Sequence, residues 1–294
     1  MYKAVVFFDL DQTLLNDDKQ VPPENVAALK ALEANQILPV IATGRNYYEL
    51  ADIMAATGVR SAIAANGGDI FLDGDHIFQS VIGEPQLTRF LNTSAAQDIQ
   101  VAMYNSEASA LTGHNQLTTD NYAQVRQTPP PVKPSFYEHE AICMMLMFVP
   151  WTDAGDQIGK QFIQDFPEMT FYRNSHYTFD VVNHGISKGS GMAILLNQPS
   201  LRGLPTYAFG DGYNDIPLLQ AADTGIAMGN AYPKVAAVAD YQTDDYRENG
   251  IPNALAHFNL TWIIHLGIGD MKSHLAGLKA TFGALRILTE RRSW

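Results

Sequence analysis

The chain has 294 residues, 46% of them hydrophobic and 17% charged, which is the composition of a soluble globular protein large enough for two domains. Its formal net charge of -12 argues against a nucleic-acid partner, because binding a phosphate backbone requires an excess of Lys and Arg, whereas a small phosphorylated substrate needs only a few cations in one cleft. Cys143 is the single cysteine, so no disulfide framework forms within the chain. With neither a signal peptide nor an apolar stretch near the ~20 residues of a membrane span, we expect a cytoplasmic protein.

A buried strand at the start of the chain runs into two carboxylates. Residues 4–8 are continuously apolar, which is typical of an inner strand of a parallel sheet, and Asp9 and Asp11 follow. If the chain stays extended, the two side chains point the same way, and a cation between them would relieve their repulsion. Mg²⁺ prefers such carboxylate and carbonyl ligands. Acidic residues after a strand also cap helices or line solvated loops, so this pair by itself leaves both interpretations open.

Strands and helices alternate from here to residue 82. This order, with short connections, predicts a parallel sheet with right-handed crossovers. Asp73-Gly74 between two short apolar runs predicts a tight hairpin, and Asn66-Gly67-Gly68 follows the third strand. The predicted elements are strands at 4–8, Ile37–Ala42 and 61–65, a helix starting at 21–24, a helix over 47–56 that ends near Gly58, and hairpin strands at 70–72 and 76–78.

The alternation of strands and helices stops between residues 83 and 184. We interpret this segment as a separate α+β unit inserted into the first domain, with the Pro-rich residues 129–131 as a stiff extended segment. Its predicted helices are Glu84–Ala96 and 153–166, and its predicted strands are 99–104, 141–149, Met169–Arg173 and 177–182. The alternation of helices and strands that is typical of a parallel sheet resumes at Ile186. Its predicted helices are 188–197, 216–222, 233–239 and 251–258, and its predicted strands are 205–209 and 224–228.

The polar turn at 210–215 carries the most specific local signal. Asp211 and Asp215 lie four residues apart across the turn into a helix, which places them on one side, one turn apart. They follow a buried strand, so their charge requires compensation. A calcium loop is the competing interpretation, but the regular spacing and closing Glu of an EF-hand are missing.

Two further segments offer donors to a phosphoryl group. Thr43 and Gly44 follow the second strand, at the edge where open α/β sheets bind ligands, and they present a hydroxyl and a backbone N–H. Lys188 begins a helix, whose positive end favours a phosphate nearby. Considered alone, the first segment is more commonly a helix cap with a turn glycine, and the second a solvated lysine.

Taken in order, these four elements resemble the haloacid dehalogenase (HAD) superfamily of phosphohydrolases. The resemblance rests on Asp-x-Asp-x-Thr-Leu at 9–14, on Thr43, on Lys188 and on Gly-Asp-Gly-Tyr-Asn-Asp at 210–215. The place of the inserted unit is similar to that of the large α/β cap in the Cof-type, sugar-phosphate phosphatase branch. The resemblance covers about residues 1–259. The resemblance implies an α/β fold with a HAD-like, Rossmann-like parallel-sheet core at 1–82 and 185–259 and an inserted α+β cap at 83–184. We expect residues 260–294 to form a C-terminal helical extension, which the resemblance does not include.

The resemblance also implies roles for individual residues. Asp9 is the implied nucleophile that forms an aspartyl-phosphate, and Asp11 is the general acid and then the general base. The implied phosphate-binding groups are the side chains of Thr43, Lys188 and Asn214 and the backbone N–H groups of Leu10 and Gly44. The implied Mg²⁺ ligands are Asp9, the carbonyl of Asp11 and Asp211, with Asp215 supporting the metal site.

The cap should close over the cleft and select the leaving group. The candidate substrate contacts are Arg45 and two residues of the last cap hairpin, Arg173 and His176. Alternatively, Arg173 and His176 are exposed polar residues of the hairpin, and Arg45 holds its loop against the cap. The expected activity is Mg²⁺-dependent hydrolysis of a small phosphorylated metabolite such as a sugar phosphate. A phosphomutase is the alternative enzyme, for which few cap cations are present beyond Arg173, Arg126 and Lys133. A phospho-accepting regulator is the non-enzymatic alternative.

The resemblance does not explain residues 260–294. Apolar residues recur there at three- and four-residue spacing from Met271 to Leu288, which predicts an amphipathic helix, and interspersed Lys and Arg make the segment basic. We expect this helix to dock on the acidic remainder of the chain or to form a homodimer, with a membrane-surface helix as the alternative.

Overall fold

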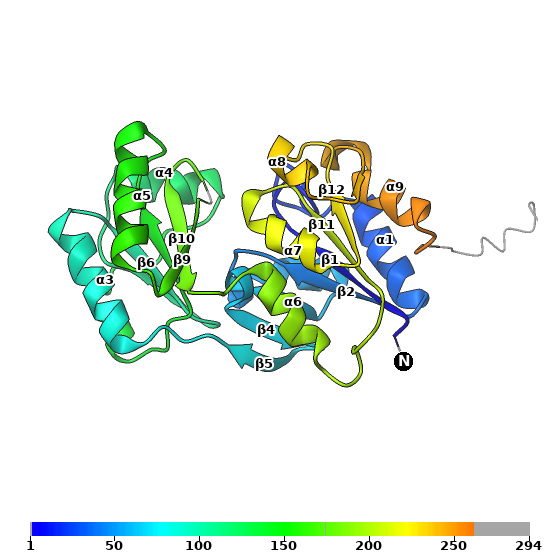
Figure 1. Ribbon diagram of the computed structural model, residues 1–294, viewed down its shortest axis with the longest axis horizontal. Helices are drawn as coiled ribbons and strands as arrows, with labels where there is room; N and C mark the ends of the chain where they lie inside the picture. Colours follow the sequence, from blue (N-terminus) through cyan, green and yellow to red (C-terminus); the bar gives the residue numbers. More distant parts are fainter. Residues whose placement is uncertain (1, 174, 262–294) are drawn as a thin grey trace, which may run out of the picture. The chain divides into compact units, whose positions relative to one another are not determined.

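The computed structural model describes residues 2–173 and 175–261, and the structural statements below concern those residues. An eight-stranded sheet contains the first and last parts of the described chain, in the order β13-β12-β11-β1-β2-β3-β4-β5 (Figure 1). The strands from β13 to β3 run parallel, and β4 and β5 form an antiparallel hairpin at one edge, which confirms the predicted sheet and hairpin. The strands are β1 (Ala4–Phe8), β2 (Ile37–Ala42), β3 (Ser61–Ala64), β4 (Asp69–Leu72), β5 (Asp75–Gln79), β11 (Thr206–Gly210), β12 (Thr224–Ala227) and β13 (Tyr241–Gln242).

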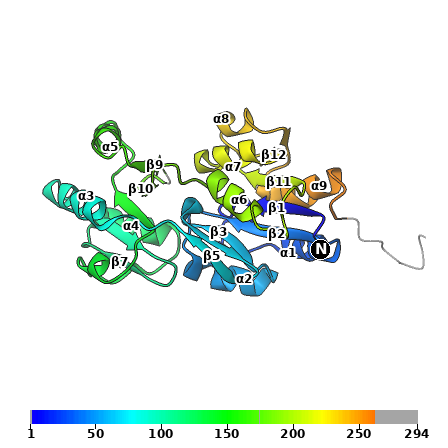
Figure 2. The ribbon, with the colours of Figure 1, turned by 60° about the horizontal axis from the view of Figure 1, so that its bottom comes forward.

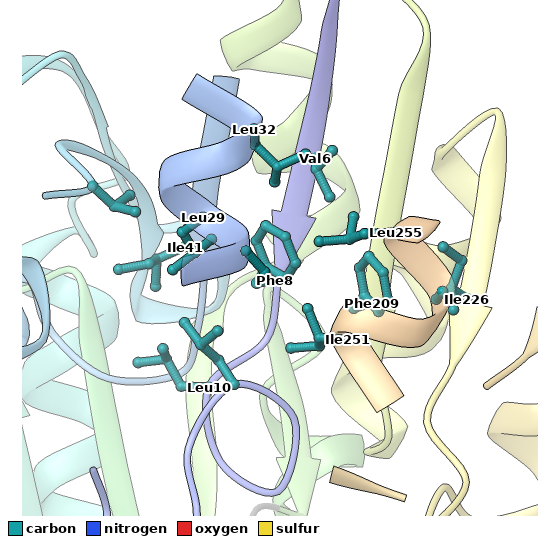
Figure 3. Close-up of a cluster of buried hydrophobic side chains, with 14 of the residues drawn as sticks. Val6, Phe8, Leu10, Leu29, Leu32, Ile41, Phe209, Ile226, Ile251 and Leu255 are labelled. Carbon is teal, nitrogen blue, oxygen red and sulfur yellow. The ribbon is translucent and has the colours of Figure 1, made fainter. Parts of the chain in front are cut away.

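Helices cover both faces of this sheet. On one face lie α1 (Pro23–Ala34), α2 (Ala51–Thr57) and α9 (Gly250–His257), and on the other α6 (Lys188–Leu196), α7 (Ile216–Ala221) and α8 (Pro233–Ala236). Side chains of β1 alternate between the two cores: Val6 and Phe8 pack with Leu29 of α1 (Figure 3), whereas Val5 and Phe7 belong to the cluster formed with α6 and α7. The strand is apolar throughout because both of its faces are buried, and each large side chain removed from water contributes ~1.5–3 kcal/mol.

A second, antiparallel sheet belongs to the inserted segment, where Figure 2 labels its strands β7, β9 and β10. It has five strands, in the order β7-β6-β8-β10-β9. Its strands are β6 (Val101–Tyr104), β7 (Ser109–Leu111), β8 (Met144–Phe148), β9 (Met169–Arg173) and β10 (Thr178–Asn183). The helices α3 (Glu84–Ala96) and α5 (Asp153–Asp165) bury Phe90 and Phe162 against one face. The opposite face packs against Tyr122 of α4 (Gln116–Gln124). The fold is therefore a parallel-sheet core with an inserted α+β cap, as the sequence predicts.

The structure differs from the sequence-based prediction between residues 105 and 140, where the sequence pattern predicts neither β7 nor α4. The α4 helix contains Thr, Asn and Asp, which have low helix propensity. It is capped by Asn115, whose side chain accepts the backbone N–H of Thr118 at 3.0 Å. The helix predicted over 47–56 is a 3₁₀ turn, Tyr47–Leu50, followed by α2. It ends at Gly58 with φ of 83°, the left-handed conformation that glycine adopts most readily.

The C-terminal extension was predicted for residues 260–294, and 262–294 lie outside the described residues, so its helix and the homodimer remain predictions. Leu260, just before that segment, is buried, and its carbonyl accepts a hydrogen bond from the Asn35 side chain at 2.9 Å. None of the described helices has the length and hydropathy that a bilayer span requires. The domain boundaries 1–82 with 185–259 and 83–184 remain our proposal.

Candidate active site

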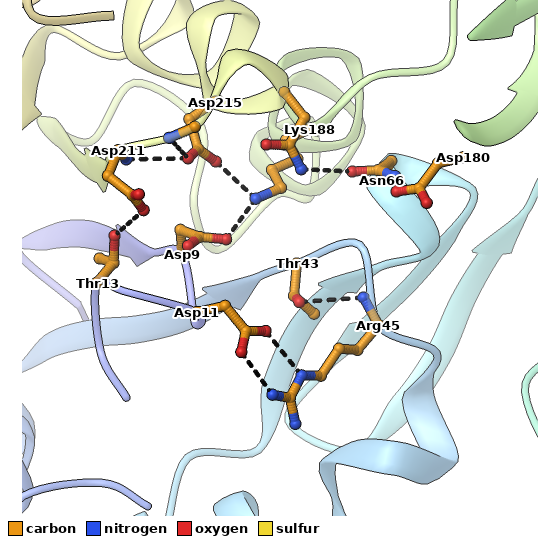
Figure 4. A network of polar contacts seen from close by, with 12 residues as sticks. Asp9, Asp11, Thr13, Thr43, Arg45, Asn66, Asp180, Lys188, Asp211 and Asp215 are labelled. Carbon is orange, nitrogen blue, oxygen red and sulfur yellow. Dashed lines mark hydrogen bonds and ion pairs between the residues drawn. The ribbon is translucent and has the colours of Figure 1, made fainter. Parts of the chain in front are cut away.

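The predicted site residues of the core domain meet at the carboxyl edge of the large sheet (Figure 4). Asp9 follows β1, Thr43 follows β2 and Asp211 follows β11, and these three strands are neighbours in the sheet. Lys188 is the first residue of α6, whose first turn is capped by the side chain of Ser187. Because parallel strands end side by side, residues far apart in the chain become neighbours at this edge.

Lys188 is fully buried and bridges two carboxylates. Its Nζ lies 2.5 Å from Oδ1 of Asp9 and 2.6 Å from Oδ1 of Asp215. The other oxygen of Asp215 accepts the backbone N–H groups of Asp211 at 3.1 Å and Gly212 at 2.9 Å, which holds the turn after β11. A buried ammonium is stable only when it is paired in this way, so Lys188 provides a positive charge at a fixed position next to Asp9.

Three buried carboxylates surround this ammonium. Asp9, Asp211 and Asp215 each offer an oxygen, and these oxygens lie within 4.8 Å of one another. Burial raises the pKa of Asp9 to about 7 and that of Asp211 to about 9, with the neighbouring carboxylates adding to the rise and Lys188 opposing it. Thr13 donates a hydrogen bond to Asp211 at 2.9 Å. Fully ionised, the three carboxylates would carry more negative charge than one lysine neutralises, and their hard oxygen donors fit a magnesium ion.

Asp11 contacts a different set of cations. Its carboxylate accepts Nε and a terminal nitrogen of Arg45 at 2.9 and 2.8 Å and the Nζ of Lys19 at 2.7 Å. Burial alone would raise the pKa of Asp11, but Arg45 and Lys19 outweigh it and lower that pKa to about 2. The strand ends at Phe8 and the chain turns at Leu10, so Asp11 does not continue the strand. Its side chain lies outside the acid cluster, which leaves its backbone carbonyl as the ligand that the family resemblance implies.

Unused hydrogen-bond donors lie at the ends of β1 and β2. Among the described residues, no hydrogen bond uses the backbone N–H of Leu10 or of Gly44. The Thr43 hydroxyl accepts the backbone N–H of Arg45 at 3.1 Å, which leaves its own proton for another acceptor. These groups are placed to donate to an anion at the carboxyl edge of the sheet.

A cavity of about 220 Å³ opens onto these groups. The predicted site residues that line it are Asp9, Asp11, Thr43, Gly44, Arg45, Asp211, Asn214 and Asp215. The inserted unit lines it with Tyr104, Asn121, Tyr122, Gln124, Val125, Gln127, Met144, Leu146 and Ser175. Sequence reasoning missed most of these cap residues because it missed α4, and it missed Lys19 because that residue lies in a loop without a recognisable pattern.

The structure does not place Arg173 or His176 among the residues that line this cavity, so their predicted contact with the substrate stays a prediction. Arg173 donates to the Val149 carbonyl at 2.7 Å and to Asp156 at 3.0 Å, and its guanidinium lies 3.7 Å from the Phe179 ring centroid. The His176 ring lies against Trp151, with centroids 5.0 Å apart. A residue's place in the last cap hairpin does not determine on which face of the cap sheet its side chain lies. The side chain of Arg173 lies on the face that packs against α5.

Comparison with known proteins agrees with this geometry. A sequence model of the haloacid dehalogenase-like hydrolases matches residues 6–255. YkrA of Bacillus subtilis is 29% identical over 269 residues, covering 88% of this chain and 99% of the relative. The pyridoxal phosphate phosphatase YbhA of Escherichia coli is 30% identical over 272 residues, covering 85% of this chain and 97% of the relative.

Among solved structures, a phosphatase of the haloalkanoate (HAD) enzyme superfamily from Bacteroides thetaiotaomicron matches with a TM-score of 0.80 and 28% identity, covering 88% of this chain and 96% of that chain. The family match includes Asp9, Thr43, Lys188 and the 210–215 turn, which the structure brings together at one edge of the sheet. The chain belongs to the haloacid dehalogenase-like hydrolases, as a phosphoric monoester hydrolase of the Cof type.

Proposed function

We propose that this chain hydrolyses a small phosphorylated metabolite with a neutral, hydroxylated leaving group, in a Mg²⁺-dependent reaction that passes through an aspartyl-phosphate on Asp9. The observation that carries the proposal is the place of Asp9 in the cavity wall, with its carboxylate held by Lys188 and next to Asp211 and Asp215. The buried, single Cys143 supports the expected cytoplasmic location, where thiols stay reduced.

In the first step an oxygen of Asp9 attacks phosphorus, the bond between phosphorus and the leaving oxygen breaks, and the aspartyl-phosphate forms. Lys188, the Thr43 hydroxyl and the unused backbone N–H groups of Leu10 and Gly44 supply donors for the phosphoryl oxygens. When bound among the acids, Mg²⁺ supplies positive charge that offsets both the carboxylates and the phosphoryl group. The protein thus contributes mainly position and charge, which is what phosphoryl transfer requires.

Asp11 acts first as the general acid and then as the general base. It donates a proton to the departing alkoxide and later takes one from the water that attacks phosphorus and releases phosphate from Asp9. The contacts with Arg45 and Lys19 keep this carboxylate anionic, which suits the second step. For the first step, the incoming phosphate dianion competes for the same two cations and so frees Asp11 to carry a proton.

The cap lining indicates the class of leaving group. The polar residues that the cap places in the cavity are uncharged: Tyr104, Asn121, Tyr122, Gln124, Gln127 and Ser175. The Tyr104 and Tyr122 hydroxyls lie 2.5 Å apart and hold each other in place. Among the described lining residues the cap contributes neither a cation nor an anion. A sugar or another polyol satisfies these donors and acceptors without burying an unpaired charge.

A phosphomutase would hold a second phosphate with cap cations. Arg126 pairs with Asp18 at the surface and Arg173 is held within the cap, and neither of these nor Lys133 lines the cavity. This geometry favours hydrolysis. The non-enzymatic alternative is wrong, because the chain belongs to a family of hydrolases.

A panel of phosphate monoesters assayed with Mg²⁺ tests the proposal. It includes sugar phosphates, pyridoxal phosphate because of the relative YbhA, a sugar bisphosphate and phosphoserine, whose leaving group is charged. We expect free phosphate, released fastest from the neutral polyol esters. An isomerised sugar phosphate without free phosphate would identify a mutase, and preference for phosphoserine or the bisphosphate would contradict the leaving-group class.

A further inference from the structure

The turn formed by Ala65, Asn66 and Gly67 after β3 has no part in the reaction described above, although it contacts several segments of the site. Its backbone is left-handed, with φ of 49° at Ala65 and 52° at Asn66, and Asn66 is completely buried. Asn tolerates this conformation, whereas Ala adopts it at a cost. A buried, strained turn of this kind persists only where the surrounding structure holds it.

The backbone of the turn contacts two phosphate-binding segments. The N–H of Asn66 donates to the carbonyl of Thr43 at 3.0 Å. Gly67 lies so close to Ser187 that a Cβ at this position would come within 2.1 Å of the Ser187 carbonyl oxygen. Ser187 caps α6 and precedes Lys188. The turn therefore fixes the Thr43 loop relative to the start of the helix that carries the buried lysine.

The side chain of Asn66 connects the core to the cap. Its Nδ2 donates to Oδ2 of Asp180 at 2.6 Å, and Figure 4 shows these two side chains next to each other. Its Oδ1 accepts the side-chain N–H of Asn214 at 3.1 Å. Asp180 is a buried residue of β10 in the cap. A Cβ on Gly44 would lie 3.0 Å from Oδ2 of Asp180 and 3.3 Å from Nδ2 of Asn66, so both side chains lie directly against the Gly44 backbone.

The chemistry of these groups gives the chain of hydrogen bonds a direction. The Asp180 carboxyl oxygen accepts a hydrogen bond from Nδ2 of Asn66, and this contact orients the NH₂ group of Asn66 toward the cap. The Asn66 oxygen then faces Asn214 and engages one of its two N–H groups. The second N–H of Asn214 remains for a phosphoryl oxygen in the cavity.

We propose that Asn66 is a positioning residue that transmits the docking of the cap, through Asp180, to the phosphate-binding groups Asn214 and Gly44. This inference rests on the proposed function, because that function assigns Asn214 and Gly44 to the phosphoryl group. The cap thereby does more than select the leaving group: a cap that is not docked leaves the amide of Asn66, and with it Asn214, without a defined orientation.

Asn66→Gly is the first test, because glycine keeps the left-handed backbone and only the side-chain amide is lost. We expect kcat/KM to fall about 10- to 100-fold and the inhibition constant of inorganic phosphate to rise by a similar factor, as for the loss of a hydrogen bond to a charged group. Gln79→Ala is the matched control, because it removes another core–cap hydrogen bond, to Ser106 at 2.9 Å, outside the site. Kinetic constants of that control should stay within about twofold of wild type.

The pair Asn66→Asp and Asp180→Asn separates a positioning role from a merely structural one. Asn66→Asp alone sets two carboxylates against each other and should lose more activity than Asn66→Gly. Combined with Asp180→Asn, it restores a hydrogen-bonded amide–carboxylate pair, and the phosphate inhibition constant should recover at least in part. No recovery in the double variant, or an Asn66→Gly enzyme within about twofold of wild type, would overturn the proposal. Asn66→Asp remains a test if Asn66→Gly does not fold.

Failure of the proposed function would be visible separately, as wild-type protein that releases no phosphate from any ester of the panel. Calorimetry with inorganic phosphate and Mg²⁺ then tests the link directly. Weaker phosphate binding by Asn66→Gly than by Gln79→Ala supports the positioning role. Equal affinities in these two variants, or wild-type protein that binds no phosphate, overturn it.

Discussion

Arg45 holds both carboxylate oxygens of Asp11, with Nε 2.9 Å from Oδ2 and a terminal nitrogen 2.8 Å from Oδ1. This two-point contact joins the loop after β1 to the loop after β2, the two segments expected to bind the phosphoryl group. Lys19 adds a third hydrogen bond to the same carboxylate at 2.7 Å. Asp11, which transfers protons in the proposed reaction, is thus oriented by Arg45 and Lys19, and both cations would also attract the substrate phosphate.

Arg45→Ala should lower kcat/KM about 10- to 100-fold, because hydrogen bonds to a charged group contribute ~1.5–3 kcal/mol. The kcat/KM of Arg45→Lys should lie between the values of Arg45→Ala and wild type, because an ammonium keeps the positive charge but cannot reproduce the two-point contact of a guanidinium. Steady-state kinetics with a small generic ester measures both. The control is Arg126→Ala, which removes an exposed ion pair with Asp18. An Arg45→Ala enzyme as active as this control would contradict the role.

Asp9→Asn should reduce turnover by about 10⁴-fold or more, the range expected when a covalent nucleophile is removed. The amide oxygen still accepts the hydrogen bond from Lys188, so the fold should remain intact. Circular dichroism and thermal unfolding establish the fold, and phosphate release measures turnover. Appreciable hydrolysis by a folded Asp9→Asn protein would disprove the nucleophile assignment.

Removal of the metal should abolish activity, and Asp211→Ala should weaken Mg²⁺ binding strongly, because one of the three clustered carboxylates is lost. Titration calorimetry measures the affinity, and chelation followed by readdition of Mg²⁺ tests whether activity returns. Asp223→Ala, remote from the cluster and bonded to Thr206, is the matched acidic control. Unchanged Mg²⁺ affinity in Asp211→Ala would refute the assignment.

Lys188→Met should lower the free energy of unfolding by ~3–5 kcal/mol in the absence of Mg²⁺, because Asp9 and Asp215 lose the cation that pairs them in the interior. The loss should be smaller at saturating Mg²⁺, because an ion held at the proposed site would stabilise the folded state and neutralise the same acids. Urea unfolding with chelator and with Mg²⁺ measures both values. Lys160→Met, at an exposed position of α5, should change stability little. Equal stability of the two variants would contradict the proposed role of the ion pairs.

Arg173→Ala should lower the melting temperature without changing the preference between substrates, because its guanidinium contacts only cap residues in the described structure. Gln124→Ala should instead change the preference between substrates. Gln124 lines the cavity, so its loss should raise KM for the preferred ester more than for a small generic ester. Thermal unfolding and kinetics on both esters distinguish the two effects. A specificity change in Arg173→Ala, with none in Gln124→Ala, would support the sequence-based prediction that Arg173 contacts the substrate.

Much of the core and its chemistry could be predicted from the sequence, because the signals are local. An apolar run such as residues 4–8 indicates a strand buried on both faces, and the polar residues that follow such strands meet at one edge of any parallel sheet. Asp9, Thr43 and Asp211 could therefore be placed at one edge of the sheet, and the resemblance to the haloacid dehalogenase superfamily added Lys188, which begins a helix.

The rest was decided by tertiary packing, since it depends on which side chains face each other across two sheets. Asn66 is an ordinary turn residue in the sequence, and only the positions of β10 and the 210–215 turn place Asp180 and Asn214 within hydrogen-bonding distance of it. The helix α4 has too little intrinsic propensity to be recognised and is formed through its cap and the burial of Tyr122. Arg173 turns toward α5 because Asp156 and the Phe179 ring offer it partners there, which local sequence does not encode.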